Sequence, residues 1–202
     1  IKNGVALERL LESIIIDKRI DPKTLLIGDR NAIVISARVS GYGNVYRTQI
    51  TCPNCLTEQK HNFDLNDANS TTSQQILSEL PEEIEITENG DYSVVLPKSN
   101  LNVVLRLLTG KDENKLSASL NKDNQQTQRL VTTQLKSVNG NGTTEAIQYV
   151  AQNLPSADSA FLRKIYKSVV PNINLTLGFT CSNCSHSEDM EVPLTAEFFW
   201  PQ

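Results

Sequence analysis

Patterns that would place this chain in a membrane or in a common enzyme class are missing from its 202 residues. No run of about 18 uncharged apolar residues occurs, so the sequence contains no candidate membrane span. Only two histidines are present, and neither has a nucleophile or an orienting carboxylate at the sequence distances typical of hydrolytic triads. No secretory signal pattern opens the chain, and we therefore expect synthesis in the cytosol.

Motifs for phosphate binding and nucleophilic catalysis are also absent. Residues 108–112, LTGKD, contain a Gly-Lys pair but lack the earlier glycine and the hydroxyl residue of a phosphate loop. No G-x-S-x-G motif occurs. Glu82, Glu83 and Glu85 cluster in PEEIEI, a pattern more typical of a solvated hairpin face than of a catalytic site. The sequence therefore predicts a protein that is not an enzyme.

Basic residues are too few for an obvious nucleic-acid site. The net charge is -4, and no lysine or arginine lies between Leu175 and Gln202. Nucleic-acid binding needs cationic side chains that displace counterions from phosphates. The most basic cluster, Arg163, Lys164 and Lys167, lies in a predicted helix without interleaved aromatic residues that could stack on bases. We expect no nucleic-acid partner, and a zinc-ribbon transcription or nucleic-acid accessory protein is kept as an alternative.

The N-terminal segment predicts two or three helices. In residues 3–16, leucines and isoleucines recur at helical spacing with glutamates between them. Asp21 followed by Pro22 is a typical helix start, and Gly41 and Gly43 are typical stops. We therefore predict an amphipathic opening helix and one or two further helices before residue 43.

The middle of the chain predicts a hairpin followed by helices. Asn89-Gly90 lies between two apolar runs, which is a strong signal for a β-hairpin, and residues 103–107 have the pattern of a third strand. From residue 112 to about residue 170 the pattern is helical, with breaks at residues 139–142 and at Pro155.

A helix start and a polar stretch suggest how the chain divides. Ser156 is the expected cap of the last helix in this region, whose apolar face contains Ile165 and Val169. Residues 66–75, NDANSTTSQQ, are polar and without apolar period, so they predict a linker. We therefore predict a core domain of residues 1–65 and 173–202, interrupted by an inserted β-hairpin and helical region at residues 66–172.

The four cysteines form two C-x-x-C pairs in segments that resemble each other. Aligning Cys52 with Cys181 also aligns the threonine before each first cysteine and the asparagine before each second cysteine. Polar and apolar residues alternate on both sides of each pair, as in strands that enter and leave a turn. Each segment therefore predicts a β-hairpin with a metal-binding turn, called a knuckle below. Together with the N-terminal helices and the inserted hairpin and helices, the two knuckles predict an α+β fold with a four-cysteine zinc-ribbon-like core.

The predicted metal ligands are Cys52, Cys55, Cys181 and Cys184. Two residues between the cysteines of a pair let both sulfurs point at one ion, and soft thiolates favour zinc or iron over magnesium or calcium. Four cysteines leave no open coordination position for an activated water. We therefore expect a structural site that holds zinc, with an iron-sulfur cluster as the less favoured occupant.

Other interpretations of the cysteines stay open. The pairs could form disulfides, or redox pairs with the first cysteine at a helix N-terminus, or they could be free buried thiols. His61 or His186 could replace a ligand, although packing or solvent-facing histidines are more common. Glycine is the commonest residue after the second cysteine of a knuckle, but Leu56 and Ser185 stand there. A left-handed conformation would cost either of them about 1 kcal/mol.

The C-terminal segment VPLTAEFFWPQ holds three adjacent aromatic residues, Phe198, Phe199 and Trp200. Chain ends usually fray unless they are docked. These side chains are therefore expected either to pack in the chain's own core or to anchor a partner. Both possibilities fit an interaction protein better than an enzyme.

Four blocks of sequence, taken in order, resemble the baseplate hub subunits of T4-like contractile-tailed bacteriophages. The resemblance covers about residues 25 to 201, and its most specific parts are the order of the blocks and the aromatic-proline finish. The blocks are LLIGDRNAIVISARVSGYGNVYRTQITCPNC, YSVVLPKSNLNVVLRLLTGKDE, LPSADSAFLRKIYKSVVPNINLTLGFTCSNC and EVPLTAEFFWP.

The resemblance implies a structural protein of the virion tail baseplate that is assembled in the host cytoplasm. Its implied partners are other hub, spike or wedge proteins in a large hetero-oligomeric assembly, and it implies no enzymatic activity. An alternative within the same assembly is a chaperone of tail assembly that leaves before the virion is complete.

Overall fold

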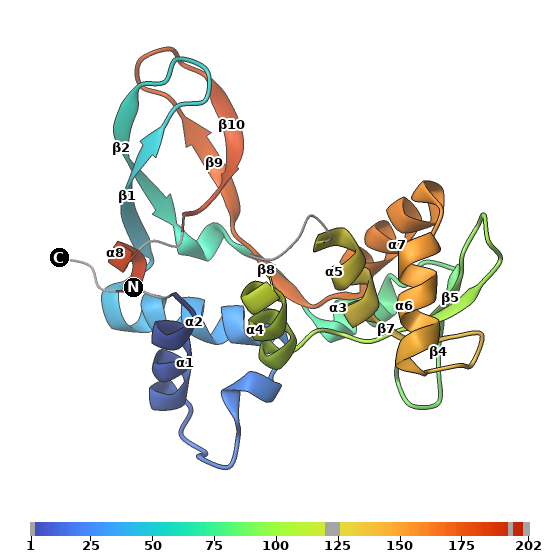
Figure 1. Ribbon diagram of the computed structural model, residues 1–202. Coiled ribbons are helices and arrows are strands. Elements are labelled where there is room, and N and C mark those ends of the chain that lie inside the picture. Colours follow the sequence, from blue (N-terminus) through green and yellow to red (C-terminus); the bar gives the residue numbers. More distant parts are fainter. Residues whose placement is uncertain (1–2, 120–125, 194–195, 200–202) are drawn as a thin grey trace. The chain divides into compact units, whose positions relative to one another are not determined.

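A computed structural model describes residues 3–119, 126–193 and 196–199 of the chain (Figure 1). The fold mixes helices and strands, so the predicted α+β class is confirmed. Two compact units are present, and each combines segments that are distant in the sequence. Unit 1 comprises Ile1–Arg30 and Thr72–Pro171, and unit 2 comprises Asn31–Thr71 and Asn172–Gln202. The predicted division into a core domain of residues 1–65 and 173–202 and an insertion of residues 66–172 stays a prediction. It did not group residues 1–30 with residues 72–171, as the compact units do.

Unit 1 contains the predicted N-terminal helices and the middle region. Helix α2, Ile27–Tyr42, begins in unit 1 and continues into unit 2. The other elements of unit 1 are α1 (Asn3–Ile14), η1 (Pro22–Thr24), α3 (Ser73–Ser78), β4 (Ile84–Ile86), β5 (Tyr92–Val95), β6 (Asn102–Leu105), α4 (Gly110–Ser119), α5 (Gln126–Gln134), β7 (Leu135–Val138), α6 (Thr144–Asn153) and α7 (Ser156–Val169).

A four-stranded antiparallel sheet with the order β4-β5-β6-β7 forms the centre of unit 1. The predicted hairpin at Asn89-Gly90 joins β4 to β5, and Gly90 has the positive φ of 78° that makes glycine favourable there. The predicted third strand is β6, which pairs with β5. Both local predictions are confirmed. The local sequence was sufficient because the turn signal and the apolar runs lie close together in it.

The prediction of helical structure from residue 112 to the break at residues 139–142 is wrong for β7, because these four residues form a strand. Residues 135–138 pair with β6, with an irregular register between Val104 and Leu105. Leu135 and Val138 are buried while Lys136 is exposed. The pairing to a strand about thirty residues away decides the conformation of this short segment, so its local pattern was not sufficient.

Helices pack on the sheet of unit 1 through one continuous hydrophobic core. The sheet contributes Val94, Val103 and Leu105, all 2% exposed or less. From the helices come Leu162, Ile165 and Val169 of α7, together with Ile76, Val131, Ile147 and Ala151. Burial of an aliphatic side chain contributes about 1.5 to 3 kcal/mol, so this core is the main source of stability in unit 1.

The start of α7 differs from the predicted Ser156 cap. Pro155 is the N-cap residue and makes no side-chain cap bond, so Ser156 is already the first helical residue. The first-turn acid Asp158 is 0% exposed and accepts hydrogen bonds from the backbone N–H groups of Lys98 (2.7 Å) and Ser99 (2.9 Å). Burial raises the pKa of this carboxyl, but the hydrogen bonds outweigh burial and lower it. Asp158 therefore connects α7 to the turn between β5 and β6.

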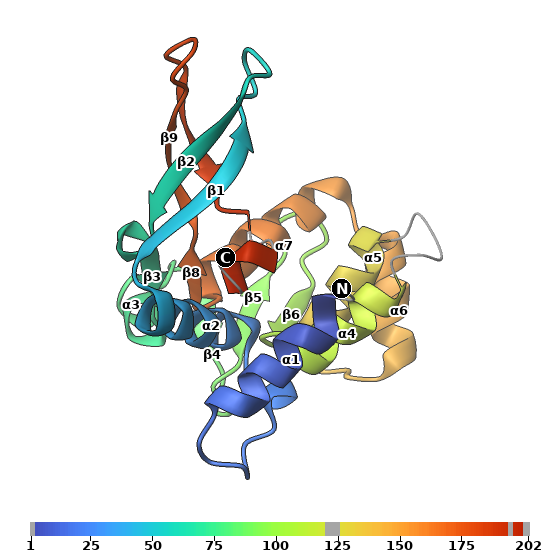
Figure 2. The same cartoon turned by 90° about the vertical axis from the view of Figure 1, so that its left-hand side faces the viewer.

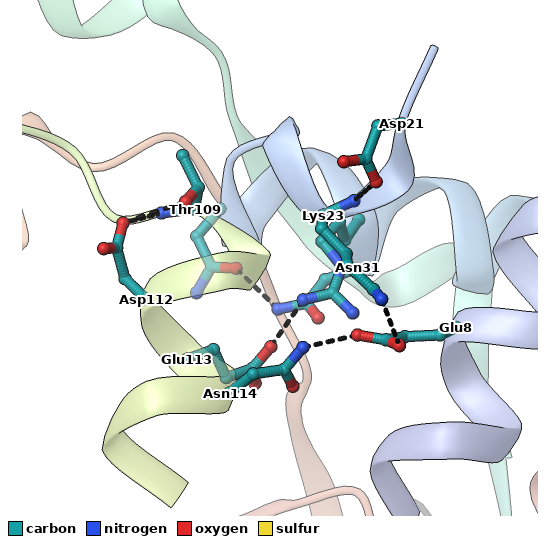
Figure 3. A network of polar contacts seen from close by, with 10 residues as sticks. Glu8, Asp21, Lys23, Asn31, Thr109, Asp112, Glu113 and Asn114 are labelled. Atoms are coloured by element: carbon teal, nitrogen blue, oxygen red, sulfur yellow. Dashed lines mark hydrogen bonds and ion pairs between the residues drawn. The ribbon is translucent and has the colours of Figure 1, made fainter. Parts of the chain in front are cut away.

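A polar network connects α1, η1, the start of α2 and α4 within unit 1 (Figure 3). Nη1 of Arg30 lies 2.7 Å from a carboxylate oxygen of Glu113, and Arg30 is only 2% exposed. A Cβ atom on Gly110 would overlap the Arg30 guanidinium, so any larger residue there would have to displace this buried side chain. Glu8 contacts both Lys23 (3.3 Å) and Asn114. The network fixes the N-terminal helices on α4.

We expect Asp112 to make unit 1 sensitive to acid. Its carboxylate, 5% exposed, accepts hydrogen bonds from Arg106 (2.9 Å) and from the backbone and hydroxyl of Thr109 (3.0 and 2.8 Å). Burial raises its pKa, but these bonds outweigh burial and lower it from 3.8 to about 2. Ionised Asp112 therefore stabilises the folded state by about 2 kcal/mol. This contribution is fully present above pH 4 and is lost as the pH falls toward 2.

Urea unfolding of the full chain at pH 6 and pH 2.5 measures this effect. Asp112→Asn should be less stable than wild type at pH 6 and should lose less stability between the two pH values. Asp29→Asn, which changes an exposed aspartate on α2, is the matched control. An equal loss in wild type and Asp112→Asn would contradict the prediction.

Unit 2 is built from two antiparallel hairpins, as the repeated C-x-x-C segments predicted. In Figures 1 and 2 the hairpins lie side by side with their turns at the same end. The elements are the remainder of α2, β1 (Val45–Thr51), β2 (Glu58–Asp64), η2 (Leu65–Asp67), β3 (Asn69–Thr71), β8 (Asn172–Asn174), β9 (Thr176–Thr180), β10 (Ser187–Glu191) and α8 (Ala196–Phe199).

The predicted linker at residues 66–75 is wrong, because most of the segment has regular structure. Strand β3 pairs with β8, about 100 residues later in the sequence, from Asn69↔Asn174 to Thr71↔Asn172. Helix α3 begins with a capping box between Thr72 and Gln75. Backbone hydrogen bonds to a distant strand hold the polar strand β3 in place. Pairing of this kind leaves no hydrophobic pattern in the local sequence.

The C-terminal aromatic residues pack in unit 2, at least in part. Phe198 is 0% exposed and makes an edge-to-face contact with Tyr46, whose hydroxyl donates to the carbonyl of Pro193 (3.0 Å). Phe199 is half-buried, and Trp200 lies outside the described residues. Of the two possibilities for this segment, packing in the chain's own core therefore holds for Phe198.

Among the helices in the described part of the chain, none combines the length and the apolar character that crossing a bilayer requires.

Candidate metal centre

The two knuckles have the same backbone hydrogen bonds. In the first, the N–H of Cys52 donates to the carbonyl of Thr57 and the N–H of Leu56 donates to the carbonyl of Cys52, both at 2.9 Å. In the second, Cys181 donates to His186 (2.8 Å) and Ser185 donates to Cys181 (3.0 Å). The pseudo-repeat found in the sequence is therefore a repeat of three-dimensional structure.

Leu56 and Ser185 both adopt the left-handed conformation that the knuckle turn requires. Their φ angles are 58° and 56°, at positions where glycine would be unstrained. Each non-glycine residue in this region costs about 1 kcal/mol. The turn hydrogen bonds hold both residues there, and Leu56 keeps its side chain 75% exposed.

The four cysteine sulfurs converge on one point between the knuckles. Sγ of Cys52 lies 3.7 Å from Sγ of Cys184, and Sγ of Cys55 lies 3.7 Å from Sγ of Cys181. All four sulfurs lie within 4.8 Å of one another. Metal-sulfur bonds of about 2.3 Å in a tetrahedron would place neighbouring sulfurs about 3.8 Å apart. The spacing therefore fits four thiolates around a single ion.

The sulfurs differ in exposure and in acidity. Cys52 and Cys181 are 0% and 1% exposed, whereas Cys55 and Cys184 are half-buried. Burial raises the pKa of Cys52 to about 11. Hydrogen bonds from Thr57 and Asn183 lower the pKa of Cys55 to about 5. A bound cation would favour the thiolate at every ligand, including the buried ones.

Disulfide and redox interpretations do not agree with this geometry. The cysteines are free, and the 3.7 Å between sulfurs is far above the roughly 2.05 Å of a disulfide bond. A redox pair would place its first cysteine at a helix N-terminus, but each pair here joins two strands. The four sulfurs instead have the arrangement of a metal site.

Neither histidine belongs to the group of candidate ligands found among the described residues, which consists of the four cysteines. The ring of His61 packs edge-to-face on Phe63 and Phe179, with centroids 4.5 and 5.3 Å apart. His186 lies 3.3 Å from the carboxylate of Glu188. His61 is therefore a packing residue between the hairpins, and His186 faces the second hairpin's own acidic strand.

Three polar side chains that connect the knuckles were not identified from the sequence. The Gln59 amide donates to the carbonyl of Thr180 (3.1 Å) and accepts from the N–H of Ser182 (2.8 Å). Asn54 and Asn183 each donate to a cysteine sulfur of the opposite knuckle. The repeated asparagine before each second cysteine was the only available sequence signal, and Gln59 had none.

A known family covers nearly the whole chain. The family described as T4 bacteriophage base plate protein matches residues 3–200, which include both knuckles, the middle region and the C-terminal aromatic residues. The chain belongs to this family. The T4 base plate protein family thus confirms the resemblance seen in the sequence blocks. Comparison with curated proteins and with solved structures found no match.

Membership in the base plate protein family identifies the general role of the chain. It is a structural component of a phage baseplate, which is a multi-protein assembly at the tail of the virion. Within that role, the four clustered cysteines could bind a metal.

Proposed function

We propose that the chain is a subunit of the baseplate hub in a contractile phage tail and that a zinc ion bound by Cys52, Cys55, Cys181 and Cys184 keeps unit 2 rigid. The observation that carries the metal part is the convergence of the four sulfurs within 4.8 Å of one another. Four thiolates form a closed tetrahedral site, which stabilises structure and has no open position for substrate.

The proposed zinc has a clear mechanical effect on the fold. The two knuckles of unit 2 are far apart in the sequence, with 125 residues between Cys55 and Cys181, and the ion would join the hairpins at their turns. Closing a loop of this length by a cross-link removes on the order of 4 to 5 kcal/mol of unfolded-chain entropy. That is comparable to the whole net stability of a typical domain.

A scaffolding role without enzymatic activity fits the same features. A saturated four-cysteine site supplies neither a nucleophile nor an activated water. Both hairpins expose charged residues, including Arg47 on β1, Lys60 on β2 and Glu188 on β10. A rigid unit of this kind presents fixed polar surfaces on which other proteins can assemble, here other hub, spike or wedge subunits.

Quantitative mass spectrometry of purified mature phage, tails and isolated hub intermediates tests the proposed position. We expect the chain at an integral copy number in hub intermediates that lack wedge proteins and at the same number in mature particles. Presence only in intermediates would instead identify an assembly chaperone that leaves the particle. Presence only after wedges are attached would contradict a hub position, and salt-sensitive binding of the purified chain to DNA or RNA would favour a nucleic-acid accessory role.

A further inference from the structure

Asn54 and Asn183 occupy the same position in the two knuckles, directly before the second cysteine. Their side chains reach across to the opposite knuckle. Nδ2 of Asn54 lies 3.6 Å from Sγ of Cys184, and Nδ2 of Asn183 lies 3.6 Å from Sγ of Cys55. The two hydrogen bonds are therefore reciprocal: the asparagine of each hairpin donates to a cysteine sulfur of the other hairpin.

We propose that Asn54 and Asn183 are positioning residues of the metal centre that slow the loss of the ion. This inference rests on the proposed four-cysteine centre. Groups that hydrogen-bond to metal ligands orient them and tune their basicity, and their loss commonly weakens metal binding 10- to 100-fold. In this chain both donors come from side chains of the opposite hairpin, so they also hold the knuckles together.

The sulfurs that receive these bonds are the ones from which the ion can be lost. Cys52 and Cys181 are buried, but Cys55 and Cys184 are half-buried and accessible to a competing chelator or to a proton. One divalent ion with four thiolates carries a net charge of about -2, and a donated N–H offsets part of the charge on the sulfur that accepts it. The asparagines therefore stabilise the more exposed half of the site.

The two asparagines are not equivalent. Asn183 also donates to Oγ1 of Thr57 (3.1 Å), whose hydroxyl lies 3.3 Å from Sγ of Cys55. A metal-bound thiolate at Cys55 can only accept, so the Thr57 hydroxyl that Asn183 orders would donate to the same sulfur. Among the contacts given for the described residues, the Asn54 side chain bonds to Cys184 alone. Substitution of Asn183 should therefore have the larger effect.

The test compares Asn54→Leu and Asn183→Leu in the full-length chain, because leucine has nearly the size of asparagine but no donor. Asn62→Leu, which changes an exposed asparagine on β2, is the matched control. Each protein is loaded with zinc and mixed with excess 4-(2-pyridylazo)resorcinol, and the rate of zinc transfer is measured. We expect one zinc per chain in all of them at the start. Transfer should be about tenfold faster from Asn54→Leu, faster still from Asn183→Leu, and unchanged in the control.

The cobalt-loaded proteins supply a readout that a change in packing alone would not move. A thiolate that loses a hydrogen-bond donor holds its electrons less tightly, so its charge-transfer band to cobalt should shift to longer wavelength in both knuckle variants. Unchanged transfer rates, or faster transfer with an unmoved band, would overturn the positioning role while leaving the metal centre in place. Failure of the wild-type chain to bind any metal would overturn the centre, and this inference with it.

Discussion

Cys181→Ser is expected to abolish stoichiometric zinc binding and to unfold unit 2 while unit 1 stays folded. Structural zinc sites contribute on the order of 10 kcal/mol of binding free energy to folding. Cys181 is 1% exposed, and a serine hydroxyl at that position is a poor ligand for a soft tetrahedral site. The variant should therefore lose both the ion and the cross-link between the two hairpins. Removal of metal from the wild type by a strong chelator should have the same effect.

Hydrogen exchange followed by mass spectrometry can measure the two units separately. In Cys181→Ser, protection should be lost in peptides that cover residues 45–64 and 176–191 and retained in those that cover residues 92–105. Thr51→Ser is the control, because Thr51 precedes Cys52 and its side chain is exposed. A wild-type chain purified without zinc or iron, together with unchanged melting of Cys181→Ser, would contradict the metal interpretation.

Phe198→Ala is expected to destabilise unit 2 by about 3 to 5 kcal/mol through the cavity that it leaves. Phe198 is 0% exposed, and its ring lies 5.1 Å from that of Tyr46 at an interplanar angle of 81°. The guanidinium of Arg38 lies 5.9 Å from the same ring and hydrogen-bonds to the carbonyl of Gly43 (2.9 Å). Truncation would therefore remove the edge-to-face contact with Tyr46 and one of the ring contacts of Arg38, which keeps its contact with Tyr42.

Thermal unfolding of the zinc-loaded chain checks this prediction. Phe198→Ala should lower the unfolding temperature of unit 2 by roughly 10 °C or more. Phe199→Ala is the matched control, because Phe199 is only half-buried and should have the smaller effect. Equal shifts from the two variants would show that Phe198 does not anchor the C-terminal segment in the core.

Short-range patterns in the sequence predicted several elements correctly for a common physical reason. The opening helix, the Asn89-Gly90 hairpin and the two knuckle hairpins each depend on residues fewer than twenty positions from one another. Turn geometry and side-chain periodicity act over this distance, so the local sequence is sufficient. The errors at β3 and β7 concern strands of three and four residues whose partners lie much further along the chain.

In the candidate site, too, the local features were predictable and the contacts between distant segments were not. The spacing of the cysteines and the similarity of the two segments identified all four members of the sulfur cluster before their distances were known. The left-handed φ of Leu56 could be stated only as a condition, because its residue type opposes that conformation. The contacts of Gln59 with the second knuckle were not predictable, since its partners Thr180 and Ser182 lie about 120 residues away.

The sequence by itself determined the chemistry of the candidate centre, which consists of two C-x-x-C turns and four soft ligands. These properties depend on residue type and on spacing along the chain. Only the tertiary structure decided that the knuckles face each other, that Asn54 and Asn183 cross between them and that Phe198 is buried. These features depend on long-range packing, in which residues far apart in the sequence compete for the same contacts, and a single sequence does not encode the outcome in any local pattern.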